Sequence, residues 1–438
     1  MSKLDELIRE LCPDGVEYVR LGTLCSLITK QTGFDYTKHI KARLLMEPTK
    51  NAVPYIQTKF FSGKNFNYQT DYYVPMDIVE QFPKITLDEK CILFSIVGAS
   101  IGNVGLFPGE RKCFLGGAIC VAKVLPQYDV DYVYYCMESH NVQHQIRRKT
   151  KGAGQATITV EDIREFEIPL PPIEIQREIV RILDNFTELT AELTAELTAR
   201  KTQYMYYRDE LLTNNYNSKI KRLEECCDSI ADGDHQAPPK ADSGIPFITI
   251  SDIDERHEIN FNVIKYVPNE YYNRLADKRR PQKGDVLYTV VGSYGIPVYV
   301  KENKKFVFQR HIAILRPNNA VVDSRYLYHA MNGTAFHRQA DLAAKGAAQK
   351  TIGLASLAKM TVPVPPLDVQ NRIVNVLDNF EKICSDLNIG LPAEIEARQK
   401  QYEYYRDKLL TFVEIGNTIL SRAEQSRAEQ SRAEQSRA

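Results

Sequence analysis

The sequence has no apolar run near the ~20 residues that a bilayer-spanning helix needs. Its first residues, MSKLDELIREL, interleave charges with apolar positions, unlike a secretory signal. Its nine cysteines form no CxxC pair and no Cys/His ligand spacing, which argues against structural zinc and for reduced thiols. We therefore expect a cytoplasmic protein without a metal site.

Net charge is also lacking, because 56 basic residues balance 56 acidic ones. This balance argues weakly against a protein that binds nucleic acid through a field over its whole surface. Basic residues do gather locally, at Arg147, Arg148, Lys149 and Lys151 and again at Lys278, Arg279, Arg280 and Lys283. Either cluster alone is most simply a solvated face.

Motifs of catalysis are missing too. The chain contains no GxxxxGK[ST] phosphate loop and no GxGxxG, since GAGQAT lacks the third glycine. It has no NPP methyltransferase motif, and its scattered histidines form no HExxH. We therefore expect no catalytic residue here, which disfavours a stand-alone enzyme.

What the sequence does contain is an internal repeat. IPLPPIEIQREIVRILDNF at 168–186 recurs as VPVPPLDVQNRIVNVLDNF at 362–380, and KGAGQATI at 151–158 recurs as KGAAQKTI at 345–352, both 194 residues later. QYMYYRDELLT from Gln203 returns from Gln401, 198 residues later. The chain has 438 residues, whereas a single hydrophobic core stops growing at about 250 to 300 residues. The length and the repeats together indicate a tandem duplication.

The repeat divides the chain into segments of different kinds. Residues 1–167 and 214–361 alternate short Val/Ile/Tyr/Phe runs with Gly, Pro and Asn, which predicts mixed sheet with hairpins. Residues 168–213 and 362–412 space apolar residues by threes and fours after a Pro-Pro pair, which predicts long helices. The first should run about 40 residues from Ile173, whereas Gly390 and Pro392 should break the second and restart it at Ala393.

The predicted fold class is α+β, with two mixed α/β domains in tandem and two helical regions pairing as an antiparallel coiled coil that buries both apolar stripes. TAEL occurs twice in succession, at 190–197, and we interpret it as a length adjuster in the first helix. A merely solvated Ala/Glu-rich helix is the alternative. Residues 413–438 end in SRAEQ repeats whose five-residue period gives no constant apolar face, so we expect a disordered or weakly helical tail.

This order of motifs, PPxxxQxxIVxxLDxF, TAEL units and QYxYYRDxLL, with the two longer blocks repeated, resembles the specificity subunits of type I restriction-modification systems. The resemblance implies that residues 1–167 and 214–361 are target recognition domains, each reading half of a bipartite DNA site. It implies that the helical regions set the spacing and bind two modification subunits, and that two restriction subunits join them. S-adenosylmethionine, ATP and magnesium are then expected on the partners, and none on this chain.

Within that family, candidate DNA-binding residues are polar side chains on glycine-rich loops, because Arg and Lys suit guanine or phosphate and Gln suits adenine. The block shared by both domains is assigned to backbone positioning or loop structure: Lys151, Gly152, Gln155, Thr157, Lys345, Gly346, Gln349 and Thr351. Base-reading candidates are those that differ between the domains: Lys30, Gln31, Lys59, Lys64, His235, Gln236, Gln309, Arg310 and His311. For any one of them, an ordinary surface loop or a satisfied hydrogen bond is at least as good an explanation.

The repeated helical motifs supply the candidates for a subunit interface: Gln176, Ile179, Phe186, Tyr204, Tyr207, Gln370, Ile373, Phe380, Tyr402 and Tyr405. The rival function is a non-catalytic coiled-coil adaptor that binds protein ligands, which zero net charge slightly favours. Salt dependence separates the two, since phosphate contacts release counterions and protein contacts mostly do not.

Overall fold

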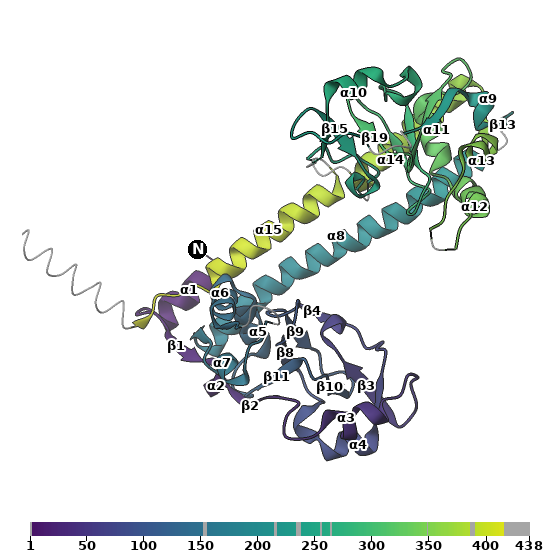
Figure 1. The fold of residues 1–438 in the computed structure, drawn as a ribbon. Helices are drawn as coiled ribbons and strands as arrows, with labels where there is room; N and C mark the ends of the chain where they lie inside the picture. The colour runs from purple at the N-terminus through teal and green to yellow at the C-terminus, as the bar shows by residue number, and fades with distance from the viewer. Residues whose placement is uncertain are drawn as a thin grey trace, which may run out of the picture. The chain divides into compact units, whose positions relative to one another are not determined.

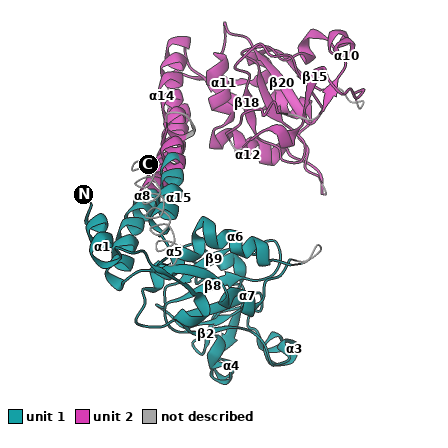
Figure 2. Ribbon diagram, turned by 90° about the vertical axis from the view of Figure 1, so that its left-hand side faces the viewer, with its two compact units in different colours: residues 1–191, 397–438 teal, residues 192–396 magenta. Residues whose placement is uncertain are grey.

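The structure is a computed structural model that describes residues 2–151, 156–213, 217–233, 238–254, 256–262, 265–347, 349–385 and 390–415. It contains two compact units, drawn in different colours in Figure 2. Unit 1 comprises residues 1–191 and 397–438, and unit 2 comprises residues 192–396. Unit 1 therefore combines most of the first repeat with the end of the second.

Unit 1 is built on an antiparallel sheet in the order β2-β11-β8-β9, beside a mixed sheet in the order β6-β3-β10-β7 (Figure 1). The strands are β1 (Glu17–Arg20), β2 (Cys25–Lys30), β3 (Ala52–Ile56), β4 (Phe61–Ser62), β5 (Asn65–Phe66), β6 (Tyr73–Pro75), β7 (Thr86–Leu87), β8 (Cys91–Ser95), β9 (Val104–Phe107), β10 (Cys113–Leu115), β11 (Ile119–Val124) and β12 (Glu167–Leu170). The helices are α1 (Lys3–Leu11), α2 (Leu21–Leu24), α3 (Tyr36–His39), α4 (Met76–Gln81), α5 (Val130–Glu138), α6 (His140–Lys149) and α7 (Val160–Arg164).

Alternation along β8 divides the interior of unit 1 into two cores. Ile92 and Phe94 pack with α5 and the long helix, whereas Leu93 points to the opposite face and packs with the mixed sheet. Both sets are buried, which is why this strand is apolar throughout instead of alternating with polar residues.

Unit 2 repeats this design with a shorter second sheet. Its main sheet has the order β14-β20-β17-β18, and its mixed sheet has the order β16-β15-β19. The strands are β13 (Lys219–Arg222), β14 (Cys227–Asp232), β15 (Ile245–Ile248), β16 (Tyr266–Val267), β17 (Val286–Thr289), β18 (Pro297–Tyr299), β19 (Val307–Phe308), β20 (Ile312–Pro317) and β21 (Thr361–Val364). The helices are α9 (Leu223–Cys226), α10 (Asn269–Arg274), α11 (Ser324–Met331), α12 (Thr334–Ala343) and α13 (Leu354–Lys359).

Three long helices follow the sheet domains: α8 (Ile173–Thr213), α14 (Leu367–Ser385) and α15 (Leu391–Leu409). Their extents confirm the predicted first helix of about 40 residues, which spans 41, and the predicted break in the second. The second helical region restarts at Leu391, two residues before the predicted Ala393, because Pro392 is tolerated in the first turn of a helix.

Each unit pairs the start of one helical repeat with the end of the other. In unit 2, Phe380 of α14 lies against Tyr204 and Tyr207 of α8, with ring centroids 6.4 and 5.9 Å apart. Burial raises the pKa of Cys384, also on α14, and the charges of Lys201 and Arg200 on α8 act to lower it. Later residues of α14 thus meet earlier residues of α8, which is the predicted antiparallel pairing. In unit 1, Phe186 of α8 stacks on Tyr405 of α15 at 5.5 Å. The TAEL run crosses the division between the units.

The described part of the chain includes no helix that is both long and apolar enough to span a bilayer. All nine cysteines are free thiols, as expected. The SRAEQ tail lies outside the described residues.

Candidate nucleic-acid interface

Both units contain the same pair of loops, which we call the paired loops: residues 97–102 with 151–157 in unit 1, and residues 291–295 with 345–351 in unit 2. Gly98 and Gly292 have φ values of 83° and 74°, a region that glycine enters without steric cost. The amide of Gly98 donates to the carbonyl of Ala156 at 3.1 Å, and the amide of Gly292 donates to that of Lys350 at 3.0 Å. Each glycine turn is thereby fixed against the second loop.

The second loop is closed by its own backbone. Lys151 and Thr157 exchange amide-to-carbonyl hydrogen bonds of 3.0 and 2.9 Å, and Lys345 and Thr351 exchange bonds of 2.9 and 2.8 Å. Gly346 has φ 118°, and a Cβ there would lie 2.4 Å from the carbonyl oxygen of Gln349. These contacts give the shared KGxxQxT block a role in loop structure. Gly152 and Gln155 lie outside the described residues.

Cations differ around the two sets of paired loops. In unit 1 the last turn of α6 carries Arg147, Arg148 and Lys149 and leads directly into Lys151. Among the residues that the structure describes, no ion pair involves any of these four. In unit 2 the last turn of α12 has no basic residue.

The basic cluster at Lys278–Lys283 is different, because two of its four cations, Arg279 and Arg280, pair with acids within unit 2. Arg279 approaches Asp232 at 3.7 Å, and Arg280 approaches Asp277 at 3.5 Å. Nearby, Arg316 binds both Asp277 and Asp285, at 2.7 and 3.1 Å. The two arginines of this second cluster therefore belong to a structural network, whereas Lys278 and Lys283 are exposed.

One corner of the main sheet is built in opposite ways in the two units. In unit 1, Gln31 follows β2 and its amide Nε2 donates 2.5 Å to the carbonyl of Leu115, beside Gly117. In unit 2, Gly233 follows β14, where a Cβ would lie 2.2 Å from the carbonyl oxygen of Phe308, and exposed Arg310 occupies the place of Gly117. The long side chain at this corner is Gln31 after β2 in unit 1 and Arg310 after β19 in unit 2, so it comes from opposite sides of the corner.

Several predicted DNA-binding residues of unit 1 have partners inside the unit. Lys59 pairs with Asp71, and Lys64 pairs with Asp184 and, at 3.1 Å, with Asp131. Lys64 Nζ also lies 4.6 Å from the ring centroid of Tyr135. Lys64 and Gln31 therefore hold unit 1 together, which is the alternative that the sequence left open for them.

The remaining candidates are placed on loops or strand ends. Lys30 ends β2 and is half-buried, as are Gln309 and His311 on either side of the exposed Arg310. No ion pair to Arg310 exists within the described ranges. His235 and Gln236 lie outside the described residues, so the proposed loop around them stays a prediction.

The glutamine of each PPxxxQ motif is buried inside its own unit. Gln176 accepts from the amide of Asp129 at 3.1 Å and donates to the carbonyl of Pro171 at 2.7 Å. Gln370 accepts from Asp323 at 2.7 Å and donates to Pro365 at 2.7 Å. The motif thus ties the start of a long helix to the start of α5 or α11.

Burial also separates the predicted interface residues into two groups. Gln176, Ile179, Gln370 and Ile373 are at most 3% exposed, so they contribute to the core of the chain and present no surface to a partner. The aromatic residues are more accessible: Tyr207 and Tyr405 are 39% and 37% exposed, and Phe186, Phe380, Tyr204 and Tyr402 are half-buried. Sequence periodicity marked both groups as apolar without showing which side faces solvent.

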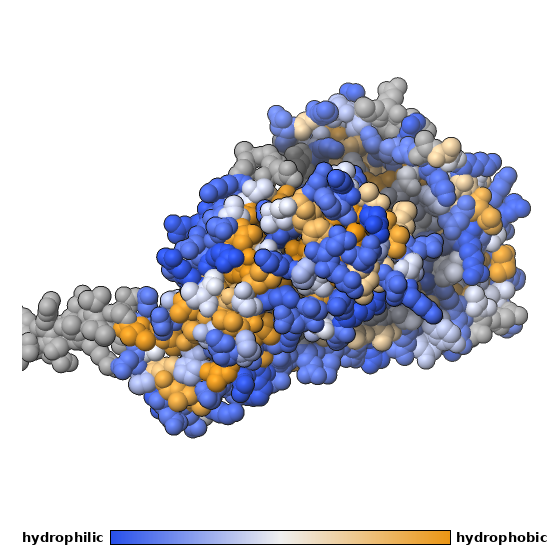
Figure 3. Space-filling model, turned by 90° about the horizontal axis from the view of Figure 1, so that it is seen from below, coloured by the Kyte–Doolittle hydropathy of each residue, from blue (hydrophilic) through white to orange (hydrophobic). Residues whose placement is uncertain are grey.

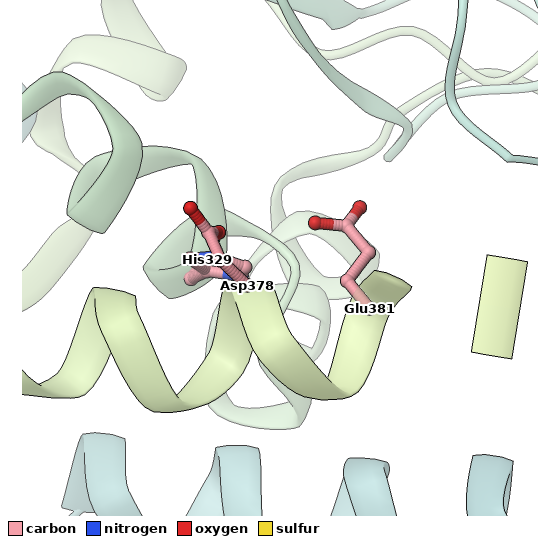
Figure 4. Close-up of side chains that lie close together, drawn as sticks. All are labelled: His329, Asp378 and Glu381. Carbon is pink, nitrogen blue, oxygen red and sulfur yellow. The ribbon is translucent and has the colours of Figure 1, made fainter. Parts of the chain in front are cut away.

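A cluster of side chains joins α11 to α14, and its members His329, Asp378 and Glu381 appear in Figure 4. His329 Nε2 lies 2.7 Å from Asp378 Oδ1, which also accepts from Arg325 Nε at 2.8 Å, and Arg325 pairs with Glu381 as well. Burial lowers the pKa of His329. Because Arg325 already supplies a cation to both carboxylates, the cluster is explained as an ion-pair network without a metal.

The face drawn in Figure 3 is mostly hydrophilic, with hydrophobic side chains in separate patches. A face of this kind is ordinary for a folded protein and does not by itself mark a binding site.

Comparison with known proteins places this architecture in a family. The family model for the type I restriction modification DNA specificity domain matches residues 13–200 and again residues 215–397. The chain belongs to this family. Each match covers one copy of the duplicated sequence, as the resemblance predicted.

Two relatives show how far the similarity extends. A putative type I restriction enzyme specificity subunit of Haemophilus influenzae is 33% identical over 357 residues, which cover 78% of this chain and 88% of the relative. The specificity subunit of an Escherichia coli type I restriction enzyme is 34% identical over 272 residues, covering 57% of this chain and 63% of the relative.

A solved structure from work on assembly and conformational transition of the type I restriction-modification system aligns with a TM-score of 0.61 at 20% identity. It covers 91% of this chain and 98% of the solved one. At that identity the likeness establishes the fold.

A glycine turn after an apolar strand is visible in the sequence of both domains, but Gly98 and Gly292, which position the paired loops, were not among the candidate site residues. The signal was present as VGAS and VGSY after apolar strands, one repeat apart. The solvated face that the sequence favoured for Arg147, Arg148 and Lys149 agrees with the exposure of both arginines, but only the tertiary structure separates these cations, unpaired within the described residues, from the paired arginines of the second cluster.

Proposed function

We propose that this chain is the DNA-reading subunit of a type I restriction-modification enzyme, and that each unit reads one half of a bipartite site. The observation that carries the proposal is the double match to the DNA specificity domain, one copy over each sheet domain. The paired loops support it, because two units with the same loop scaffold and different side chains around it suit two different half-sites.

Catalysis is assigned to partner subunits. Two modification subunits would use S-adenosylmethionine to methylate adenine after extruding the base, and two restriction subunits would use ATP and magnesium. We propose that the partner subunits dock on the accessible aromatic residues of the helices, which are Tyr206 and Tyr207 in unit 2 and Tyr404 and Tyr405 in unit 1. Tyr206 and Tyr404 are 64% and 61% exposed, and they occur once in each repeat.

The experiment is single-molecule sequencing for methylated adenine in DNA from cells that contain this chain with its modification subunit, against cells that lack the chain. A new bipartite motif that depends on the chain supports the proposal and names both half-sites. Absence of any new motif, with all subunits present, contradicts it and favours the adaptor.

A second experiment tests the spacer function of the TAEL run. Deleting residues 190–193 shortens α8 by ~6 Å, which lies between one and two base-pair steps of ~3.4 Å. We expect both half-sites to be kept and the number of bases between them to change. Methylation of the original motif by the deletion variant would show that the run does not set the spacing.

A further inference from the structure

The two units differ in charge at the same place beside the paired loops. Residues 147–149 at the end of α6 are Arg, Arg and Lys, whereas the residues 194 positions later at the end of α12 are Asp341, Leu342 and Ala343. The helices correspond in order and lead into the same KGxxQxT loop. Three cations in unit 1 are thus replaced by one anion and two apolar residues in unit 2.

The cations of unit 1 are available to a ligand. Arg147, Arg148 and Lys151 are exposed and Lys149 is half-buried. Asp162, on α7 just after the loop, accepts from the hydroxyl of Thr159 at 2.6 Å and from its amide at 3.2 Å. Burial raises the pKa of Asp162, but the Thr159 hydrogen bonds and the charges of Lys151 and Lys149 lower it, and the net shift is downward. No direct ion pair forms in this part of the described chain.

A helix end alone does not account for these residues. One cation near a helix C-terminus contributes about 0.3 to 1 kcal/mol, and α12 is formed without any. In unit 2, Asp341 instead accepts from the hydroxyl of Tyr294 at 2.9 Å, so this acid fastens the helix to the glycine turn. Leu342 beside it is 86% exposed. The last turn of α12 is therefore a poor place for an anion.

We propose that the last turn of α6, with Lys151, is a site for DNA backbone phosphates in unit 1, and that the last turn of α12 in unit 2 binds no phosphate. The two units then contribute unequally to DNA binding. Most of the contacts to DNA phosphates are made beside the half-site of unit 1. This inference rests on the proposed function, since it concerns how the same DNA is held.

The test measures binding of the full chain to a duplex carrying the methylated motif, by fluorescence anisotropy at several salt concentrations. Each phosphate contact contributes about 0.9 to the slope of log affinity against log salt. A variant with Arg147→Gln, Arg148→Gln and Lys149→Gln should lose about 2.7 from that slope, three contacts at about 0.9 each. Circular dichroism checks that the variant is folded.

Two control variants separate contact from general charge. Arg372→Gln removes one exposed positive charge from α14 in unit 2, where Asp368 on the same helix is its one ion-pair partner among the described residues. It should leave the slope unchanged. Leu342→Arg places in unit 2 the cation that Arg148 supplies in unit 1, and it should raise the slope by about 0.9.

Phosphate ethylation interference then locates the contacts. Ethylation should interfere with wild-type binding in both half-sites, and the triple variant should lose interference in one half-site only. An unchanged slope in the triple variant, or an equal loss per charge in Arg372→Gln, would overturn the inference while leaving DNA reading intact. Failure of the wild-type chain to bind the duplex would instead contradict the proposed function.

Discussion

The two units join the sheet domain to the long helix through the same acidic position but with different partner side chains. In unit 1, Asp184 of α8 accepts from the hydroxyl of Tyr135 at 2.6 Å and pairs with Lys64. In unit 2, Asp378 of α14 occupies the equivalent position and binds His329 and Arg325. Both repeats have an aspartate at this position, but the residues that bind it differ between the two units.

The difference has a consequence for acid sensitivity. Burial raises the pKa of Tyr135, so this junction has no aromatic group that titrates near neutral pH. Burial lowers the pKa of His329 below its ordinary value of about 6.5. The same fold is therefore expected to respond to pH in unit 2 at a place where unit 1 does not.

The largest loss of stability is expected at Gly233, where the absence of a side chain lets the backbone of β19 approach closely. Gly233→Ala in unit 2 should lower the free energy of unfolding by about 3 kcal/mol, because its Cβ would lie 2.2 Å from the backbone oxygen of Phe308. Denaturant titration with hydrogen exchange of the β14 and β19 peptides measures it. Gly353→Ala is the control, with open space around the new Cβ and an expected loss below about 1 kcal/mol. Equal losses in the two variants would contradict the steric explanation.

The next effect should be the same in both units. Gln176→Ala and Gln370→Ala each remove the side-chain partner of a part-buried amide and of a buried carbonyl, so each should cost about 2 kcal/mol in its own unit. Hydrogen exchange of α5 reports the first variant and that of α11 the second. A loss confined to one of the two units would mean that the PPxxxQ motif has different roles in the two repeats.

At the junction acids we expect an unequal effect, no larger than that of the glutamine variants in unit 2 and smaller in unit 1. Asp378→Asn should destabilise unit 2 by about 2 kcal/mol, because Arg325 and His329 lose a shared charged acceptor. Asp184→Asn should cost unit 1 less than about 1 kcal/mol, since its side chain is 47% exposed and solvent screens the pair with Lys64. Unfolding of the two variants, followed unit by unit by hydrogen exchange, tests the order; a larger loss in unit 1 would reverse the comparison.

The smallest effect is the dependence on pH. Because burial puts the pKa of His329 below that of the unfolded chain, the unfolded state binds the extra proton first as pH falls. The contribution of His329 is complete above about pH 6.5 and is lost below it, by at most about 1.4 kcal/mol per pH unit. Burial lowers the pKa values of His257 and His337 in the same direction.

His329→Tyr makes the junction of unit 2 like that of unit 1. We expect the stability of unit 2 to fall less steeply between pH 6.5 and 5 than in the wild type, when hydrogen exchange is corrected for its intrinsic pH dependence. An unchanged slope would assign the acid sensitivity to His257 and His337. Asp378 provides an internal reference: burial alone would raise its pKa, but the His329 hydrogen bond and the Arg325 charge lower it, so its own contribution is lost only below about pH 3.8.

Local sequence patterns predicted the elements whose cause is itself local. Pro171 and Pro172 precede a 41-residue helix, and Gly390 with Pro392 marks the break between α14 and α15. The same patterns placed Gln176 and Ile179 among interface residues, whereas both are buried in unit 1. Helical spacing identifies an apolar side of a helix, but a sheet domain and a partner helix compete for that side, and the outcome depends on contacts distant in sequence.

By itself the sequence determined the duplication, the class of each segment and the family, because repeats, proline and glycine positions and apolar spacing act over a few residues or are exact copies. Only the tertiary structure decided which cations are free. Lys64 is neutralised by Asp131 and Asp184, acids 67 and 120 residues away, whereas Arg147 and Arg148 meet no acid within the described chain. Charge pairing depends on distance in space, and in this protein the fold sets that distance.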